Sequence, residues 1–180
     1  LNSVTVFIMK DISIIVAHDL NYGIGINNQL AWHCPQDMSY FKTITSQTTS
    51  PSKKNAVLMG RKTWDSIPKK FKPLSSRYNM VLSRQSVSFH DQAYTAHSVD
   101  SAIQHFRQLV EKGDCEHLFC IGGGKLYQEM IHHPDIDTLY VTKIMSTFNC
   151  DSFFPDYSSH YLLNHDSEII HCNSFSIQFL

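Results

Sequence analysis

The feature that most constrains the fold of this chain is a set of short, nearly uninterrupted apolar runs. Runs of this length that are rich in Val and Ile are typical of strands covered on both faces by other parts of a protein. Such strands belong to sheets that carry helices on both sides. We therefore predict strands at Ile12–Ala17, Ala56–Met59, Met80–Leu82, Leu118–Ile121 and Leu139–Val141.

Segments with helical periodicity lie between these runs. The clearest is Val99–Val110, in which apolar residues recur three or four positions apart, with Ser98 as the predicted N-cap and Gly113 just beyond the end. A shorter apolar stripe follows Pro35, a residue suited to the first turn of a helix, and a third lies at Leu126–Ile131. This alternation of strand and helix predicts a mostly parallel sheet.

The C-terminal segment has a different pattern. Glu168–Cys172 and Phe175–Leu180 are separated by Asn173-Ser174, which predicts an antiparallel hairpin. The chain has 180 residues, a length typical of one domain, and contains no internal repeat or linker. The predicted fold class is α/β: a single domain with a central, mostly parallel β-sheet, flanking helices and a C-terminal antiparallel hairpin.

Charge and residue spacing argue against several functional classes. Lys and Arg number 15 against 16 Asp and Glu, for a net charge of -1, so we expect neither a nucleic-acid nor a membrane partner. No apolar run approaches the roughly 18–20 residues that a membrane-spanning helix needs. The 11 His show no HxxxH or HExxH spacing, so no metal site is expected.

The cysteine content fits a reducing compartment, because the five cysteines form no CxxC pair and no even framework. We therefore expect a cytoplasmic protein. Residues 1–10 lack the basic region that opens a signal peptide, and we interpret them as an extension or tag of unknown role. The folded domain is predicted to cover residues 11–180.

Three of the predicted strands are followed by residues suited to an anion. Gly122-Gly123-Gly124-Lys125 leads into a helix, and so does Gly60-Arg61-Lys62-Thr63; Ser83-Arg84 follows a third strand. Alone, each is also explained by a tight turn or a solvated basic turn. Because the carboxyl ends of parallel strands meet at one sheet edge, together they predict a site for a phosphorylated nucleotide. The cations, with no acid at these turns, favour NADP over NAD.

Asp37 falls in the first turn of a predicted helix, beside Met38 and Phe41. One interpretation is that the acid complements the helix dipole. The other is a carboxylate in an apolar cleft that binds a flat nitrogen heterocycle through both oxygens. Thr142 and Trp32 are candidates to fix and cover such a carboxylate, although both contacts are remote in sequence.

Taken in order along the chain, these motifs resemble dihydrofolate reductases. The matching blocks are Gly23-Ile24-Gly25, Leu30-Ala31-Trp32, Pro35-Gln36-Asp37-Met38, Phe41, Met59–Pro68, Ser83-Arg84, Ile121–Gly124 and Tyr140-Val141-Thr142. The resemblance extends from about Asp11 to the C-terminus. It implies reduction of 7,8-dihydrofolate to 5,6,7,8-tetrahydrofolate with NADPH, by hydride transfer to pterin C6 and protonation of N5, for one-carbon metabolism and thymidylate synthesis. It also implies binding of antifolates such as methotrexate, and we expect a monomer.

The resemblance further implies roles for individual residues. Asp37, Trp32 and Thr142 are the implied catalytic residues, Arg77 is implied to pair with the substrate's glutamate α-carboxylate, and the Gly122–Gly123 peptide is implied to be cis. The implied substrate-binding residues are Ile15, Val16, Asp37, Met38, Phe41, Ile67, Leu74, Arg77, Ile121 and Thr142. The implied cofactor-binding residues are Ala17, Ile24, Gly25, Asn28, Gln29, Leu30, Gly60, Arg61, Lys62, Thr63, Leu82, Ser83, Arg84, Ile121, Gly122, Gly123, Gly124, Lys125, Leu126 and Tyr127.

Two alternatives stay open at this point. A related pyrimidine reductase of riboflavin synthesis shares the fold but lacks the set Trp32, Asp37 and Thr142. A non-catalytic nucleotide-binding module would be expected to have lost Asp37, the glycine run or Arg77, and all three are present. Fusion to a thymidylate synthase beyond these residues is also left open. Departures from the family pattern, from which we expect altered inhibitor preference and loop kinetics, are Ala31, Cys34, Phe71 and Cys150.

Overall fold

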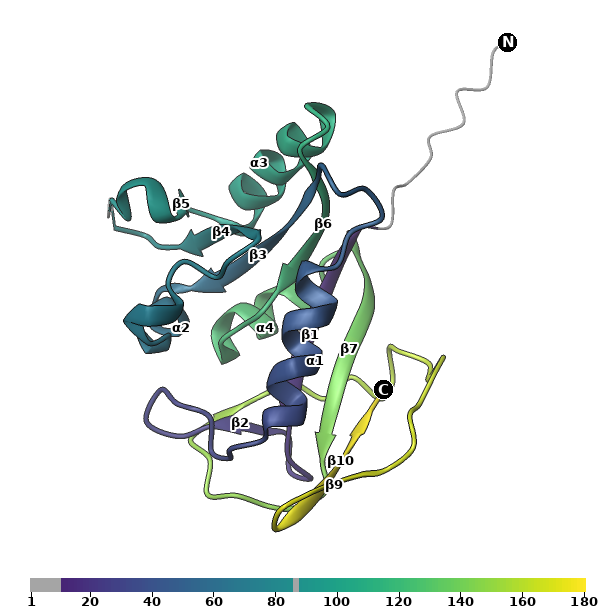
Figure 1. Ribbon diagram of the computed structural model, residues 1–180. Helices are drawn as coiled ribbons and strands as arrows, with labels where there is room; N and C mark the ends of the chain where they lie inside the picture. The colour runs from purple at the N-terminus through teal and green to yellow at the C-terminus, as the bar shows by residue number, and fades with distance from the viewer. Residues whose placement is uncertain (1–10, 86–87) are drawn as a thin grey trace.

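The computed structural model describes residues 11–85 and 88–180 and is built around an eight-stranded sheet (Figure 1). The strand order is β5-β4-β3-β6-β1-β7-β10-β9. Neighbours from β5 to β7 pair in parallel, whereas β10 pairs antiparallel with both β7 and β9. The strands of this sheet are β1 (Ile12–His18), β3 (Lys54–Gly60), β4 (Arg77–Leu82), β5 (Tyr94–Ala96), β6 (Cys115–Cys120), β7 (Ile136–Ile144), β9 (Ile170–Cys172) and β10 (Phe175–Phe179).

Helices and a small second sheet complete the described part of the chain. The second sheet pairs two short antiparallel strands, β2 (Gly23–Gly25) and β8 (Ser152–Phe153). The α-helices are α1 (Pro35–Ser46), α2 (Arg61–Ser66), α3 (Val99–Glu111) and α4 (Gly124–Met130), and 3-10 turns lie at Lys69–Phe71 and His90–Gln92.

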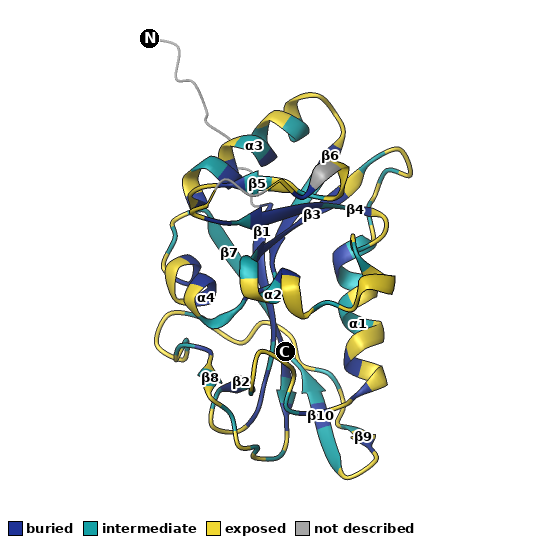
Figure 2. Ribbon diagram, turned by 90° about the vertical axis from the view of Figure 1, so that its left-hand side faces the viewer, coloured by how far each residue is buried: buried dark blue, intermediate teal, exposed yellow. Residues whose placement is uncertain are grey.

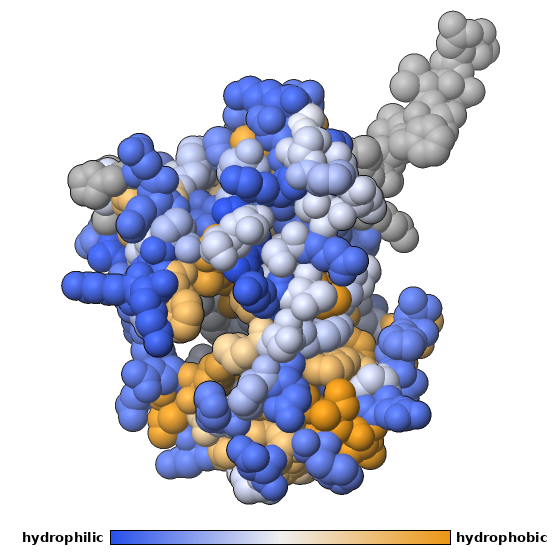
Figure 3. Space-filling model, in the orientation of Figure 1, coloured by the Kyte–Doolittle hydropathy of each residue, from blue (hydrophilic) through white to orange (hydrophobic). Residues whose placement is uncertain are grey.

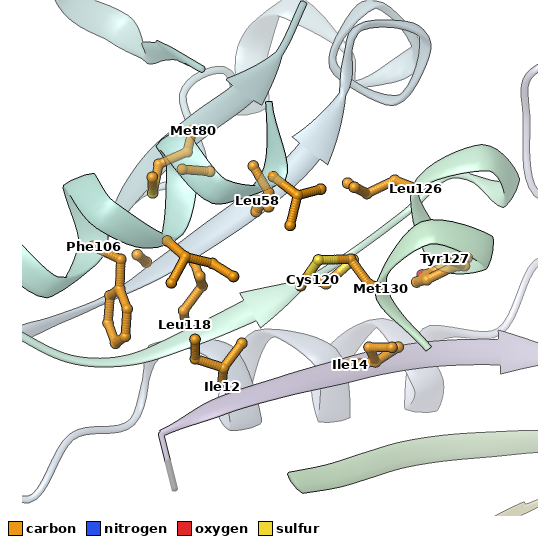
Figure 4. Close-up of a cluster of buried hydrophobic side chains, with 14 of the residues drawn as sticks. Ile12, Ile14, Leu58, Met80, Phe106, Leu118, Cys120, Leu126, Tyr127 and Met130 are labelled. Carbon is orange, nitrogen blue, oxygen red and sulfur yellow. The ribbon is translucent and has the colours of Figure 1, made fainter. Parts of the chain in front are cut away.

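The central strands are buried on both faces because successive side chains point to opposite sides of a sheet. Ile12 and Ile14 of β1 pack with α3 and α4 in the first core cluster, which contains Phe106 (Figure 4). Ile15, the next residue after Ile14, points to the other face of the sheet and packs with Trp64 of α2 and with partly buried residues of α1. Figure 2 shows these strands buried between helices whose outer faces are exposed. This explains why the strands appear in the sequence as continuous apolar runs.

The structure confirms the predicted fold class and each predicted helix and core strand, with small shifts at their ends. Ser98 caps α3: its hydroxyl accepts a hydrogen bond from the Ser101 backbone N–H at 3.0 Å, and Gly113 follows with a φ of 80°. The hairpin is also present, although its first strand begins at Ile170 and not at Glu168. Three strands were not predicted, β2, β5 and β8, because two or three residues are too few to show a period.

Candidate active site

The carboxyl ends of the parallel strands bring distant parts of the sequence to one edge of the sheet. Ala17 of β1 lies opposite Thr142 of β7, and Gly60 of β3 lies opposite Leu82 of β4. The backbone N–H of Gly60 donates to the carbonyl of Gly122 at 2.7 Å, which joins the glycine run to the end of β3. Ligands of open α/β sheets bind at this edge.

Asp37 is buried at this edge, on α1. The helix starts at Pro35, so Asp37 lies in its first turn, with only 5% of its surface exposed. Burial raises the pKa of the Asp37 carboxyl, and a hydrogen bond with the Thr142 side chain opposes part of that rise. Thr142 is itself buried on β7. A carboxylate that keeps few water contacts and one hydroxyl partner is placed to bind a ligand with N–H groups.

Trp32 lies just before α1 and is buried as well. Its ring packs on Phe148 at 5.5 Å between centroids. Its indole Nε1 is buried and has no hydrogen-bond partner among the described residues. Because buried N–H groups are rarely left without a partner, Nε1 is suited to donate to a water or a ligand.

Arg77, the first residue of β4, is a buried cation. Its Nη1 donates to the Thr45 hydroxyl at 2.8 Å, its Nε donates to the Ser75 carbonyl at 2.9 Å, and its guanidinium lies 6.0 Å from the centre of the Phe41 ring. Burial lowers the pKa of Arg77, which stays charged at neutral pH. Within residues 11–85 and 88–180 it forms no ion pair with a carboxylate, so it is available to an anionic ligand.

An apolar wall includes Phe41, whose ring lies 6.0 Å from the Arg77 guanidinium. Ile15 forms one cluster with Phe41, Ile67, Leu74 and Ile121, five residues that the sequence assigned to substrate binding. Figure 3 shows hydrophobic side chains around a hollow in the middle of this face of the molecule.

Two other residues predicted to bind substrate, Val16 and Met38, are not part of this apolar cluster. Val16 packs in the first core cluster because it points to the opposite face of β1 from Ile15. Met38 is 44% exposed, so it shields Asp37 less than its position beside it suggests.

The glycine run adopts the expected backbone. The Gly122–Gly123 peptide is cis, and Gly122 has a φ of 99°. A Cβ on Gly122 would lie 2.7 Å from the Tyr127 ring, whose hydroxyl donates to the Ile15 carbonyl at 2.8 Å. A Cβ on Gly123 would lie 3.3 Å from the Thr63 hydroxyl. Glycine is therefore required at position 122, where the backbone has a positive φ and lies directly against the Tyr127 ring.

The predicted phosphate-binding side chains follow β3 and β4 at the same edge of the sheet, and some already have partners. Arg61 forms an ion pair with Asp65 one turn along α2, at 3.0 Å. The Ser83 hydroxyl donates to the Gln85 carbonyl at 3.1 Å, while Lys62 and Arg84 are exposed. An anion would therefore compete with Asp65 for Arg61.

The loop between β2 and α1 reaches the same region, since the Asn28 side-chain amide donates to the Lys62 carbonyl at 2.8 Å. Gln29 and Leu30 belong to this loop, whereas Ile24 and Gly25 are in β2, and Gly25 sits against the Gln29 carbonyl, which a Cβ would approach to 2.5 Å. Three other predicted cofactor residues are part of the first core cluster: Leu82, Leu126 and Tyr127. Lys125, at the start of α4, is exposed.

Two further residues at this site were not predicted from the sequence. His97 directly follows β5, and its Nδ1 donates to the Ser83 carbonyl at 3.0 Å, which adds an imidazole beside Arg84. Thr45 is fully buried on α1 and positions Arg77. A polar residue after a strand could have indicated His97, but β5 is too short to be recognised. The contact of Thr45 depends on tertiary structure alone.

Within the described residues, no helix is long and apolar enough to cross a bilayer. No group of three or more His, Cys, Asp or Glu side chains in the same residues is arranged to hold a metal ion.

Comparison with known proteins identifies the family. The family model for dihydrofolate reductase matches residues 11–180. The chain is 38% identical over 146 residues to a dihydrofolate reductase of Heliothis virescens, covering 81% of this chain and 79% of that protein. It is 39% identical over 153 residues to the Pneumocystis carinii enzyme of the same name, covering 81% of this chain and 74% of that one.

Bifunctional relatives are much longer. The chain is 40% identical over 145 residues to bifunctional dihydrofolate reductase-thymidylate synthase 2 of Arabidopsis thaliana, which covers 79% of this chain but only 26% of the relative. The chain thus spans about a quarter of the length of such relatives. With a family match over nearly its whole length and the site described above, the chain belongs to the dihydrofolate reductase family.

Proposed function

We propose that this chain catalyses the reduction of 7,8-dihydrofolate to 5,6,7,8-tetrahydrofolate with NADPH as the cofactor. The observation that carries the proposal is the buried Asp37 carboxyl, hydrogen-bonded to Thr142 at the ligand-binding edge of a parallel sheet. Both oxygens of this carboxylate can accept hydrogen bonds from the N3 and 2-amino groups of a pterin.

Asp37 binds and orients the pterin ring. Because burial raises the pKa of Asp37, the complex of Asp37 with a bound pterin more readily holds a proton. Thr142 holds the carboxyl in place from β7. Trp32 Nε1, which is buried without a protein partner in the described residues, is suited to donate to a water near Asp37. We propose that the proton for pterin N5 arrives through such a water. Turnover should then fall as pH rises, because fewer protons are available for transfer to pterin N5.

Arg77 supplies the second anchor of the substrate. A planar guanidinium binds a carboxylate through two parallel hydrogen bonds, and Arg77 has no carboxylate partner within the described residues. The aminobenzoyl part of dihydrofolate is apolar and flat, which fits the cluster of Ile15, Phe41, Ile67, Leu74 and Ile121. We infer that Arg77 binds the α-carboxylate of the glutamate tail.

The residues at the sheet edge fit NADPH. Gly60, Gly122 and Gly123 carry no side chains that could cover their backbone N–H groups, and Arg61, Lys62 and Arg84 supply positive charge for phosphates. These residues would hold the dinucleotide, and Arg61 with Arg84 would bind its 2′-phosphate. When bound, NADPH supplies the hydride that pterin C6 accepts.

The assay of this proposal follows the absorbance of the reduced nicotinamide with and without dihydrofolate. Wild-type protein should consume NADPH only when dihydrofolate is present, and methotrexate should stop the reaction. Asp37→Asn should lower turnover at pH 7 by about 100-fold or more. Asp114→Asn, which changes an exposed acid elsewhere, is the matched control. A turnover equal to that of the wild type in Asp37→Asn would contradict the role assigned to Asp37.

The alternatives are less well supported. The matched family is dihydrofolate reductase, which does not favour the riboflavin-pathway reductase, and the intact site does not favour a non-catalytic module. A cytoplasmic location and a monomeric state remain proposals. The location is supported by the five cysteines, all of which are free thiols.

A further inference from the structure

Two cysteines that the proposed reaction does not use lie against each other. The Sγ atoms of Cys34 and Cys172 are 2.8 Å apart, and each residue has only 2% of its surface exposed. Cys34 is the N-cap of α1, and Cys172 is the last residue of β9. The contact therefore joins the start of the helix that carries Asp37 to the C-terminal hairpin.

The separation of these sulfurs is shorter than ordinary packing. Even carbon atoms pack at roughly 3.5–4.0 Å when they are not bonded, and sulfur is larger. The two side chains lie in one buried cluster with Trp32, Ile144 and Ile177. Besides its contact with Cys172, the Cys34 thiol makes a weak hydrogen bond to the Gln36 side-chain oxygen, with 3.6 Å between the sulfur and the oxygen.

We propose that Cys34 and Cys172 form a reversible disulfide when the protein meets a peroxide. The sulfur atoms of a disulfide are about 2.05 Å apart, so the two Sγ atoms need to close by roughly 0.8 Å. A shift of that size is within reach of small rotations about the two Cα–Cβ bonds. The site is a modification site of this chain, and neither cysteine is among the residues assigned to substrate or cofactor binding.

The chemistry balances with hydrogen peroxide as the oxidant. One thiol loses its proton, and the thiolate attacks an oxygen of the peroxide; the O–O bond breaks to give a sulfenic acid and hydroxide, which takes up the released proton to become water. The second thiol then displaces the hydroxyl from that sulfur, which forms the S–S bond and releases a second water. The two sulfurs lose two electrons in total and the peroxide gains them. Hydrogen peroxide is small enough to reach a buried pair during local opening.

The surroundings of Cys172 influence the rate. Burial, the neighbouring Cys34 and the Asp37 carboxylate on α1 raise the pKa of Cys172 to about 12, so its thiolate is scarce at neutral pH. Oxidation should therefore accelerate as pH rises from 7 to 9, because the thiolate is the reactive form.

Once formed, the bond would close a loop between residues 138 positions apart. Cross-links across long loops restrict the unfolded chain most, so the oxidised protein should melt about 5–15 °C higher than the reduced one. Asp37 follows Cys34 by three residues, so the oxidised state also anchors the first turn of α1 to the hairpin. Dithiothreitol should reverse both effects.

The test treats the whole purified chain with hydrogen peroxide and counts thiols after unfolding in denaturant. The proposal expects loss of two of the five thiols, a mass decrease of two hydrogens, and a peptide in which Cys34 and Cys172 are linked. Cys34→Ser and Cys172→Ser should each abolish the linked peptide and the rise in melting temperature. Cys150→Ser, which removes a partly exposed thiol, should keep both.

Three results would overturn the proposal. They are a gain of oxygen without loss of two hydrogens, a linked peptide that contains a different cysteine, and equal thiol loss in Cys172→Ser and wild type. Peptide mapping of the wild-type protein decides the question even if a serine variant does not fold.

Discussion

The Thr45 hydroxyl accepts a hydrogen bond from Arg77 Nη1 at 2.8 Å while donating its own proton to the Phe41 carbonyl at 2.7 Å. The hydroxyl proton is thus committed to the helix backbone, and the oxygen is left to orient the guanidinium. Arg77 has a fixed direction as a result, although 32 residues separate it from Thr45. The pair shows how one helix positions the anchor for the substrate tail on a neighbouring strand.

Thr45→Val should therefore raise the KM for dihydrofolate by about tenfold, since one hydrogen bond to a charged group is lost, and leave kcat nearly unchanged. Steady-state kinetics with dihydrofolate as the varied substrate would measure the effect. Thr43→Val, on the exposed side of α1, is the matched control and should behave as wild type. A fall in kcat with an unchanged KM would contradict this positioning role.

Asp37→Asn should stabilise the protein while it removes activity. Because burial raises the pKa of Asp37 in the folded state, the ionised carboxylate opposes folding at neutral pH. Replacing it with a neutral amide should raise the free energy of unfolding at pH 7 by about 0.5–2 kcal/mol. Urea unfolding of both proteins would measure the difference.

The raised pKa of Asp37 also predicts how the difference in the free energy of unfolding between Asp37→Asn and wild type depends on pH. The stability that the protonated Asp37 contributes is fully present below the ordinary aspartate pKa of about 3.9 and is lost as pH rises through the higher folded value. The stability advantage of Asp37→Asn should therefore grow across this interval and level off above it. An advantage that shrinks with rising pH would mean that the carboxyl is stabilised in its charged form.

Gly122→Ala should be much more damaging than Gly113→Ala. Both glycines have a positive φ, 99° and 80°, but a Cβ on Gly122 would lie 2.7 Å from Tyr127 whereas one on Gly113 meets nothing within 4 Å. We expect losses in the free energy of unfolding of roughly 2–4 kcal/mol and about 1 kcal/mol, respectively. Urea unfolding of both variants measures these losses. Because Gly113→Ala introduces only backbone strain, the extra loss in Gly122→Ala reports the steric clash with Tyr127. Equal losses would contradict a close approach of Tyr127.

Arg61→Ala should weaken NADPH binding by about 10–100-fold and change NADH binding less than twofold, because a 2′-phosphate loses a charged partner. Lys112→Ala, which removes an exposed cation beyond α3, is the control. Equal weakening of both nucleotides would remove Arg61 from the 2′-phosphate site.

Asp65→Asn should change the affinity for NADPH in the opposite direction from Arg61→Ala. Because the ion pair with Asp65 at 3.0 Å occupies Arg61, releasing it should strengthen NADPH binding about two- to fivefold. Fluorescence titration with NADPH measures this change. Weaker binding in the variant would show that Asp65 positions Arg61 for the phosphate and does not compete with it.

The sequence by itself determined the elements whose signal is local. The apolar runs predicted the core strands, the spacing of Val99–Val110 predicted α3, and Ser98 predicted its cap. Asp37 and the glycine run could be identified because dihydrofolate reductases share those short motifs. Short strands such as β5 were missed, since three residues carry no period.

Tertiary structure alone decided which distant residues meet. Thr45 with Arg77, His97 with Ser83, and Cys34 with Cys172 are contacts between different elements, and their pairing follows from strand order and register. The division of β1 between two cores, with Ile15 on one face and Val16 on the other, has the same origin. Backbone propensity acts over a few residues, whereas these contacts depend on how the whole sheet and its helices pack.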